Sequence, residues 1–167
     1  MPVNETTIDA PPQSVWNVLA DPPSYEEWVV GNTGIRDYDR GWPTPGTEFH
    51  HKVGLGPLNV KDKTVALEAT PPSLAAHAAA VGGTPPVPRG RLVMNVRVLP
   101  AGHGVVTFEL RESGSGTLVR MEERPAGGPL KVLWPVLDPL VKLRNAETLR
   151  RLKNLAESRH RAGAARG

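Results

Sequence analysis

Three neighbouring strands are predicted within residues 91–124, RLVMNVRVLPAGHGVVTFELRESGSGTLVRMEER. Apolar and polar side chains alternate through 91–99, 104–112 and 117–124, and glycine-rich turns separate these segments. Turns this short join antiparallel neighbours. One apolar face on each strand therefore predicts a one-layer antiparallel sheet that is covered on one side.

The preceding part of the chain predicts more of the same sheet. Further strands are expected at 3–9, 35–39, 46–53 and 58–69. Two short helices are expected between the first two of these strands. One helix enters at Pro11-Pro12, and the other is capped by Ser24 and ends at Gly31.

A long helix is predicted at the C-terminal end of the chain. A first helical segment is expected at 130–137, and Asp138-Pro139 provides the cap and first residue of a restart. Leucines at helical spacing then continue the apolar stripe to about residue 158. The order of elements is thus strand, two helices, six strands and one long helix.

The segment 73–90 interrupts this pattern between two strands. It is rich in alanine and then in proline, which favours a short helix at 74–81 followed by a stiff loop. We expect that helix to pack against Trp42 and close one end of the molecule. The alternative is an extra edge strand at 74–80.

Length and composition are those of one folded domain. The chain has 167 residues, of which 39% are hydrophobic and 22% are charged. We expect a domain at 1–158 with the 73–90 segment as an insert, and a flexible basic tail at 159–167. The first residues lack the charge and apolar run of a leader, and no long apolar run follows, so a cytoplasmic protein without stable membrane insertion is expected.

Several classes of site are disfavoured. The chain has no cysteine, and its five histidines are not spaced as metal ligands, so neither a metal nor another cofactor is expected. The net charge of +3 comes largely from the last helix and the tail, where no aromatic residue follows Trp134. Nucleic-acid binding is therefore not expected. The oligomeric state stays open.

Five short strings in this order resemble the SRPBCC superfamily (START-like, Bet v 1-like), and within it the polyketide cyclase/dehydrase-like branch. They are IDAPPQSVW at 8–16, DPPSYEEW at 21–28, PGTEFHH at 45–51, VGLGPL at 53–58 and RNAETLRRL at 144–152. The resemblance implies an α+β helix-grip fold, in which a curved seven-stranded antiparallel sheet and two short helices enclose an apolar cavity with the long C-terminal helix. It also implies a small hydrophobic ligand, such as a lipid or a polyketide. The 73–90 insert departs from the family's simplest form.

Strand parity predicts which side chains line that cavity. The expected ligand-binding residues share the inward parity and are Phe49, His51, Val60, Asp62, Thr64, Met94, Val96, Val106, Phe108, Met121 and Leu143. Glu123 is expected either to line the cavity or to pair with Arg144 at its rim.

His51 and Asp62 are the candidates for chemistry. A two-residue turn at Leu55-Gly56 would make them diagonal neighbours across a hairpin. They would then form either an acid–base pair, in which the carboxylate raises the pKa of the ring, or a structural pair that serves the polar end of a ligand. The sequence therefore predicts a carrier or sensor of a small hydrophobic molecule, with a cyclase/dehydratase-like enzyme as the alternative.

Overall fold

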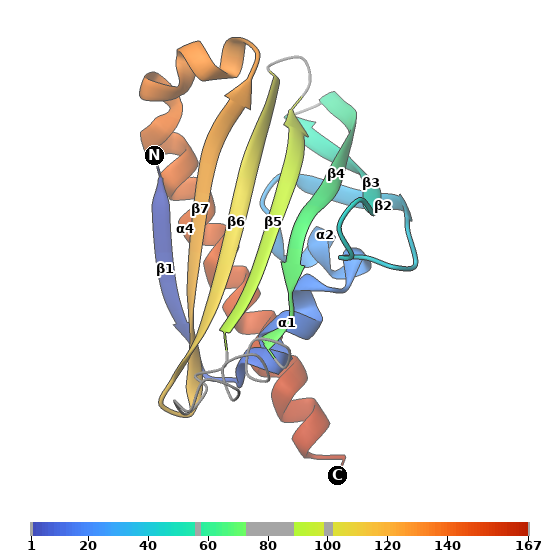
Figure 1. Ribbon diagram of the computed structural model, residues 1–167, viewed down its shortest axis with the longest axis vertical. Helices are drawn as coiled ribbons and strands as arrows, with labels where there is room; N and C mark the ends of the chain where they lie inside the picture. The colour runs from blue at the N-terminus through green and yellow to red at the C-terminus, as the bar shows by residue number, and fades with distance from the viewer. Residues whose placement is uncertain (1, 56–57, 73–88, 99–101, 167) are drawn as a thin grey trace.

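The computed structural model describes residues 2–55, 58–72, 89–98 and 102–166, and its strands form one antiparallel sheet in the order β1-β7-β6-β5-β4-β3-β2 (Figure 1). The strands are β1 (Val3–Ile8), β2 (Asn32–Tyr38), β3 (Glu48–Leu55), β4 (Leu58–Thr70), β5 (Arg89–Val98), β6 (Gly102–Ser113) and β7 (Gly116–Gly127). The helices are α1 (Pro12–Leu19), the 3-10 turn η1 (Pro22–Ser24), α2 (Tyr25–Trp28) and α4 (Pro129–Ala164). The predicted α+β helix-grip class is confirmed.

The hairpin between β6 and β7 shows how local sequence sets the register. Ser113 pairs with Gly116, and the ladder continues to Phe108 opposite Met121. Gly114 has a φ of 61°, which favours glycine at this turn. With the register fixed here, apolar residues of both strands fall on the same face, as the alternation predicts.

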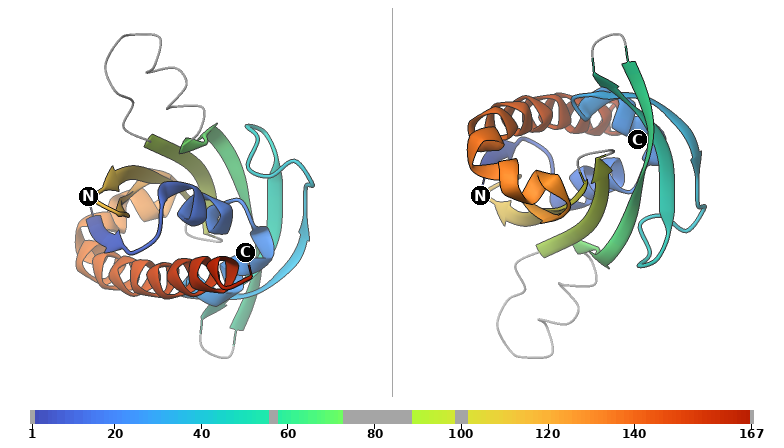
Figure 2. Two further views of the ribbon diagram at one scale, coloured as in Figure 1. Left: turned by 90° about the horizontal axis from the view of Figure 1, so that it is seen from below. Right: turned by 90° about the horizontal axis from the view of Figure 1, so that it is seen from above.

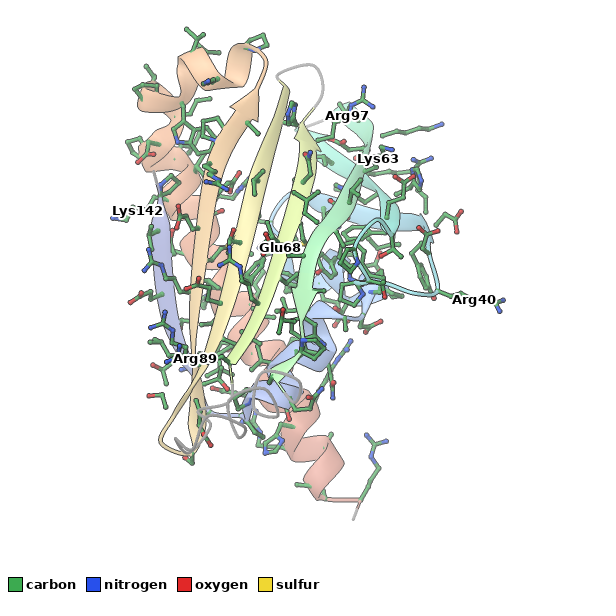
Figure 3. The ribbon with its side chains drawn as sticks, viewed as in Figure 1. Arg40, Lys63, Glu68, Arg89, Arg97 and Lys142 are labelled. Carbon is green, nitrogen blue, oxygen red and sulfur yellow. The ribbon has the colours of Figure 1, made fainter. Side chains whose placement is uncertain are left out.

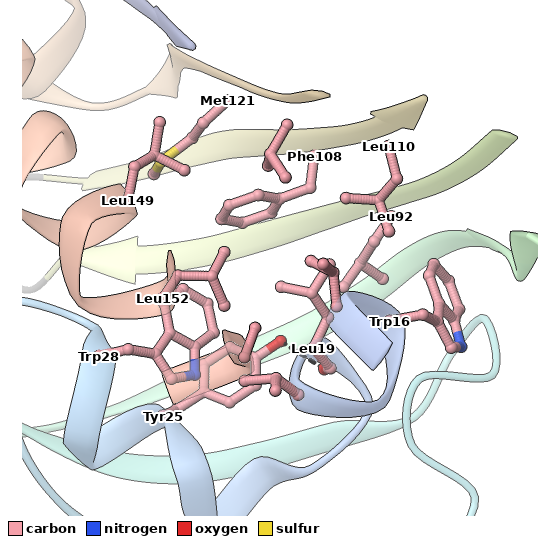
Figure 4. Close-up of a cluster of buried hydrophobic side chains, with 14 of the residues drawn as sticks. Trp16, Leu19, Tyr25, Trp28, Leu92, Phe108, Leu110, Met121, Leu149 and Leu152 are labelled. Atoms are coloured by element: carbon pink, nitrogen blue, oxygen red, sulfur yellow. Dashed lines mark hydrogen bonds between the residues drawn. The ribbon is translucent and has the colours of Figure 1, made fainter. Parts of the chain in front are cut away.

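The sheet curves around the helices, which cover its concave face (Figure 2). In the core, Trp28 meets Phe108 edge to face with ring centroids 5.9 Å apart. Leu149 and Leu152 of α4 are fully buried against the same cluster (Figure 4). The long helix is therefore held to the sheet by the second half of its apolar stripe.

α4 differs from the expected pair of helical segments. It is continuous from Pro129 to Ala164, with Pro135 and Pro139 inside it. Figure 1 shows that its first turns cross the end of β7 before the helix turns down along the sheet. The prolines thus bend the helix without ending it, since each removes only one backbone donor and local bending relieves the ring clash.

α4 continues beyond its apolar stripe to Ala164. Arg159 lies in the helix and pairs with Asp21 at 2.7 Å and with Glu27 at 3.2 Å. These ion pairs connect the last turns of α4 to the α1–α2 region after the apolar stripe has ended. A pattern of apolar residues in the sequence does not predict ion pairs of this kind.

Trp42 lies in the core and is 7% exposed. Its Nε1 donates a hydrogen bond of 3.0 Å to the carbonyl oxygen of Leu19, and its ring meets Phe49 edge to face at 4.7 Å. The expected partner segment at 74–81 lies outside the described residues. What the structure shows is that Trp42 packs on the α1–α2 region.

Candidate ligand-binding cavity

A cavity of about 120 Å³ lies between α2, α4 and the concave face of the sheet. Most of the predicted ligand-binding residues are on its wall, namely Phe49, His51, Thr64, Met94, Val96, Val106, Phe108 and Met121. They come from five adjacent strands, β3 to β7. Inward parity was therefore the right criterion for choosing residues on the strands.

Among the described residues, the cavity wall does not include Val60, Asp62 or Leu143. Val60 and Asp62 have the inward parity but lie closer than Thr64 to the turn between β3 and β4. Asp62 is 4% exposed. Leu143 is 70% exposed, so its placement in the cavity is wrong. α4 meets the cavity through Arg144, Asn145 and Thr148 instead.

The hairpin register brings His51 and Asp62 directly opposite each other rather than diagonally. Leu55 pairs with Leu58, so the ladder is shifted by two residues from the one expected for a turn at Leu55-Gly56. A shift of two preserves the face of every side chain, which is why the inward parity survived the wrong register.

The His51 ring is held by Thr64. Nε2 of His51 lies 3.1 Å from Oγ1 of Thr64, whereas Oδ1 of Asp62 accepts a hydrogen bond of 2.7 Å from the backbone N–H of Lys63. Nδ1 of His51 is buried and has no hydrogen-bond partner in the described part of the chain. One ring nitrogen is thus fixed, and the other is buried without a hydrogen-bond partner among the described residues.

The environment of His51 lowers its pKa from 6.5 to about 4, mainly through burial and then through the charges of Arg36 and His50. Burial favours the uncharged ring because a charge loses its hydration there. The rise in the pKa of His51 expected for an acid–base pair with Asp62 is therefore wrong. At neutral pH His51 is an uncharged imidazole.

A second polar group is built around Glu123 of β7. Glu123 is 6% exposed and lies on the cavity wall. Its Oε2 accepts a hydrogen bond of 3.0 Å from Nδ2 of Asn145 and pairs with Nη2 of Arg144. Both alternatives for Glu123 are thus present, since it lines the cavity and also pairs with Arg144.

Sequence reasoning missed Asn145. This residue is fully buried, and it stands four and seven positions before Leu149 and Leu152 on the inward face of α4. A polar residue at helical spacing within a buried apolar stripe is the signal that could have identified it. Tyr25 and Trp28 of α2 also line the cavity.

Residues 3–157 match the family described as polyketide cyclase / dehydrase and lipid transport. The chain belongs to this family. No curated protein matches the sequence.

Solved structures of the same fold are similar over nearly the whole chain. Protein NE0264 from Nitrosomonas europaea is 17% identical with a TM-score of 0.66, covering 94% of this chain and 94% of that one. Protein MLL2253 from Mesorhizobium loti is 20% identical with a TM-score of 0.61, covering 93% and 96%. DynU16, from the dynemicin biosynthetic locus, is 16% identical with a TM-score of 0.62, and the match covers 95% of this chain but 48% of that one. At these identities the likeness concerns the fold.

In this member of the family, the cavity combines a largely apolar wall with polar side chains, among them His51 and the group around Glu123. Trp28, Phe49 and Phe108 supply aromatic surface, while His51 and the Glu123 group supply hydrogen-bonding atoms. Within the described ranges, no group of three or more His, Asp or Glu side chains could hold a metal ion. Nor does any described helix have the length and apolar character needed to cross a membrane.

Proposed function

We propose that this protein binds a small, mostly apolar molecule in the cavity, as a carrier or a sensor. The observation that carries the proposal is the unpartnered Nδ1 of His51, buried in an otherwise largely apolar wall. A buried polar atom without a partner is costly, and a ligand group that hydrogen-bonds to it removes that cost. The ligand then carries a hydroxyl or similar group opposite His51.

The size of the cavity limits the part of the ligand that is enclosed. A cavity of about 150 Å³ holds a benzene ring in another protein, and the volume here is about 120 Å³. The enclosed part is therefore about one ring or a short alkyl chain. A larger ligand would extend past the rim, where Arg97 and Arg144 are exposed.

The alternative is a cyclase/dehydratase-like enzyme with His51 as the base and Asp62 beside it. The family description supports this alternative, because it includes cyclases and dehydrases. A base whose pKa lies near 4 abstracts protons weakly at neutral pH. For this reason we favour binding without turnover. In the enzyme, replacing His51 with alanine would abolish turnover and leave ligand affinity within about tenfold.

Native mass spectrometry of the freshly purified full chain, followed by titration with 2-naphthol, tests the binding proposal. Val96→Phe should fill the cavity and weaken binding at least about tenfold, because the side chain lines the wall. The matched control is Val65→Phe on the same sheet, since Val65 is half-buried and lies outside the cavity wall. Equal binding by both variants, or none by the wild type, would overturn the proposal.

A further inference from the structure

The first half of α4 exposes large apolar side chains to solvent. The exposed fractions are 81% for Val132, 52% for Leu133, 80% for Val136, 64% for Leu140 and 70% for Leu143. We call these five residues the α4 apolar face. Further along the same helix, Leu149, Leu152 and Ala156 are almost completely buried.

Four of the five residues of the α4 apolar face recur at helical spacing, and the helix bends at Pro135 and Pro139 within this stretch. At 3.6 residues per turn, positions 132, 136, 140 and 143 share one side of a helix over about three turns. Trp134, on the opposite side, is 6% exposed, so this part of α4 is anchored to the protein by its other face. The segment lies at one end of the molecule, across the end of β7 (Figures 1 and 2).

Basic residues flank the stripe. Lys131 and Lys142 are exposed, and their spacing of eleven residues places them on the same flank. Lys142 points away from the body of the molecule (Figure 3). Arg144 falls on the other flank, and Asp138 is the one acidic residue between positions 129 and 144.

We infer that the α4 apolar face docks on an anionic membrane surface. Amphipathic helices of this kind lie in the interface, with the apolar side at the boundary of headgroups and acyl chains. Lysines at the border of such a face reach lipid phosphates and contribute electrostatic attraction. This docking does not depend on the proposed ligand, although it would bring the cavity rim at Arg144 to the membrane.

A second copy of the chain fits the surface less well. A stripe about 18 Å long and about 10 Å wide is much smaller than the roughly 800 Å² that each partner contributes to a stable interface. A two-fold contact would also bring the lysines of the two copies together around the same small patch.

Sedimentation of the full-length protein with large unilamellar vesicles tests the inference. We expect binding to phosphatidylcholine vesicles containing about 30% phosphatidylserine, and at least tenfold weaker binding to pure phosphatidylcholine. V132S/V136S should reduce binding to the anionic vesicles about tenfold or more. The control L67S removes an apolar side chain that is 44% exposed on β4 and should bind as the wild type does.

The contribution of charge is tested separately. K131E/K142E should weaken binding to anionic vesicles at least about tenfold, whereas K52E/K61E, with the same charge change at two exposed lysines of β3 and β4, should have a much smaller effect. Circular dichroism confirms that each variant is folded. No binding by the wild type, or equal binding by V132S/V136S, would overturn the inference. So would a dimer in sedimentation velocity that V132S/V136S converts to a monomer.

Discussion

The ring of His51 is tied to the hydroxyl of Thr64 across neighbouring strands, with 3.1 Å between Nε2 and Oγ1. Thr64 itself pairs with Phe49 in the ladder, so the hydrogen bond runs diagonally between β3 and β4. This bond orients the imidazole and leaves Nδ1 buried, where no described residue satisfies it. His51 therefore contributes one unsatisfied ring nitrogen, in addition to the polar group around Glu123.

The stability of the protein should depend on pH through His51. In the unfolded chain this ring takes up a proton near pH 6.5, but in the folded protein its pKa is about 4. Stability from this residue is complete above pH 6.5 and is lost as the pH falls from 6.5 to 4. Between pH 7 and pH 5 we expect a loss of about 2 kcal/mol, measured by urea unfolding.

Two substitutions at His51 check this assignment. His51→Gln and His51→Phe differ in polarity, so their stabilities at pH 7 should differ. Neither residue titrates, however, and both variants should lack about 2 kcal/mol of the wild-type change between pH 7 and pH 5. If either variant retained the full change, His51 would not be its source.

Ligand selectivity should also depend on this ring. 2-Naphthol and naphthalene share an apolar body and differ by one hydroxyl group. In wild type, 2-naphthol should bind about tenfold more tightly, because its hydroxyl group pairs with Nδ1 of His51. In His51→Phe that preference should disappear. Fluorescence or calorimetric titration measures both affinities, and an unchanged preference in the variant would contradict the role of His51.

Much of the fold could be predicted from the sequence because strand alternation is a local signal. The inward parity of β3 to β7 placed most of the cavity wall correctly even though the β3–β4 register was two residues out. Parity depends only on whether a shift is odd or even. It could not predict the hydrogen bond between His51 and Thr64, which depends on the true register.

The helix face could not be predicted in the same way. Leu143 stands nine residues before Leu152, which is two and a half helical turns, so it lies on the opposite side of α4 from the buried Leu152 and faces solvent. An apolar pattern indicates that a face avoids water, but not which surface covers it. Asn145, which does reach the cavity, was hidden because polar residues on a helix are usually assigned to solvent.

The carbonyl of Leu19 provides a test of the α1–α2 region. Leu19 ends α1 and is followed closely by Pro22 and Pro23, which have no N–H group to offer. Its carbonyl oxygen instead accepts hydrogen bonds from Tyr25 Oη at 2.8 Å and from Trp42 Nε1 at 3.0 Å. Tyr25→Phe and Trp42→Phe should each cost about 1 kcal/mol, because one donor remains in either variant.

The double variant Tyr25→Phe/Trp42→Phe should cost more than the sum, by about 1 to 3 kcal/mol, since the buried carbonyl then loses both donors. Chemical denaturation of the four proteins measures this coupling. A distant pair gives the control: Thr117→Val removes a buried hydrogen bond of 2.7 Å to the carbonyl of Ala10. Its cost should add to that of Trp42→Phe within about 0.5 kcal/mol. Additivity in the Tyr25–Trp42 pair would mean that the carbonyl is satisfied in another way.

The final prediction concerns the buried end of the ion pair between Glu123 and Arg144. The side chain of Glu123 is 8% exposed and that of Arg144 is 41% exposed, so the two partners differ in access to water. Arg144→Met leaves a buried carboxylate without its counter-charge and should cost about 3 kcal/mol at pH 7. Glu123→Gln keeps an acceptor for Asn145 and leaves Arg144 partly hydrated, so it should cost only about 1 kcal/mol.

In the double variant Glu123→Gln/Arg144→Met no unpaired buried charge remains, and stability should recover to near that of Glu123→Gln. Urea unfolding of the three variants decides the point, and a larger cost for Glu123→Gln than for Arg144→Met would show that the pair does not stabilise the protein by neutralising a buried carboxylate.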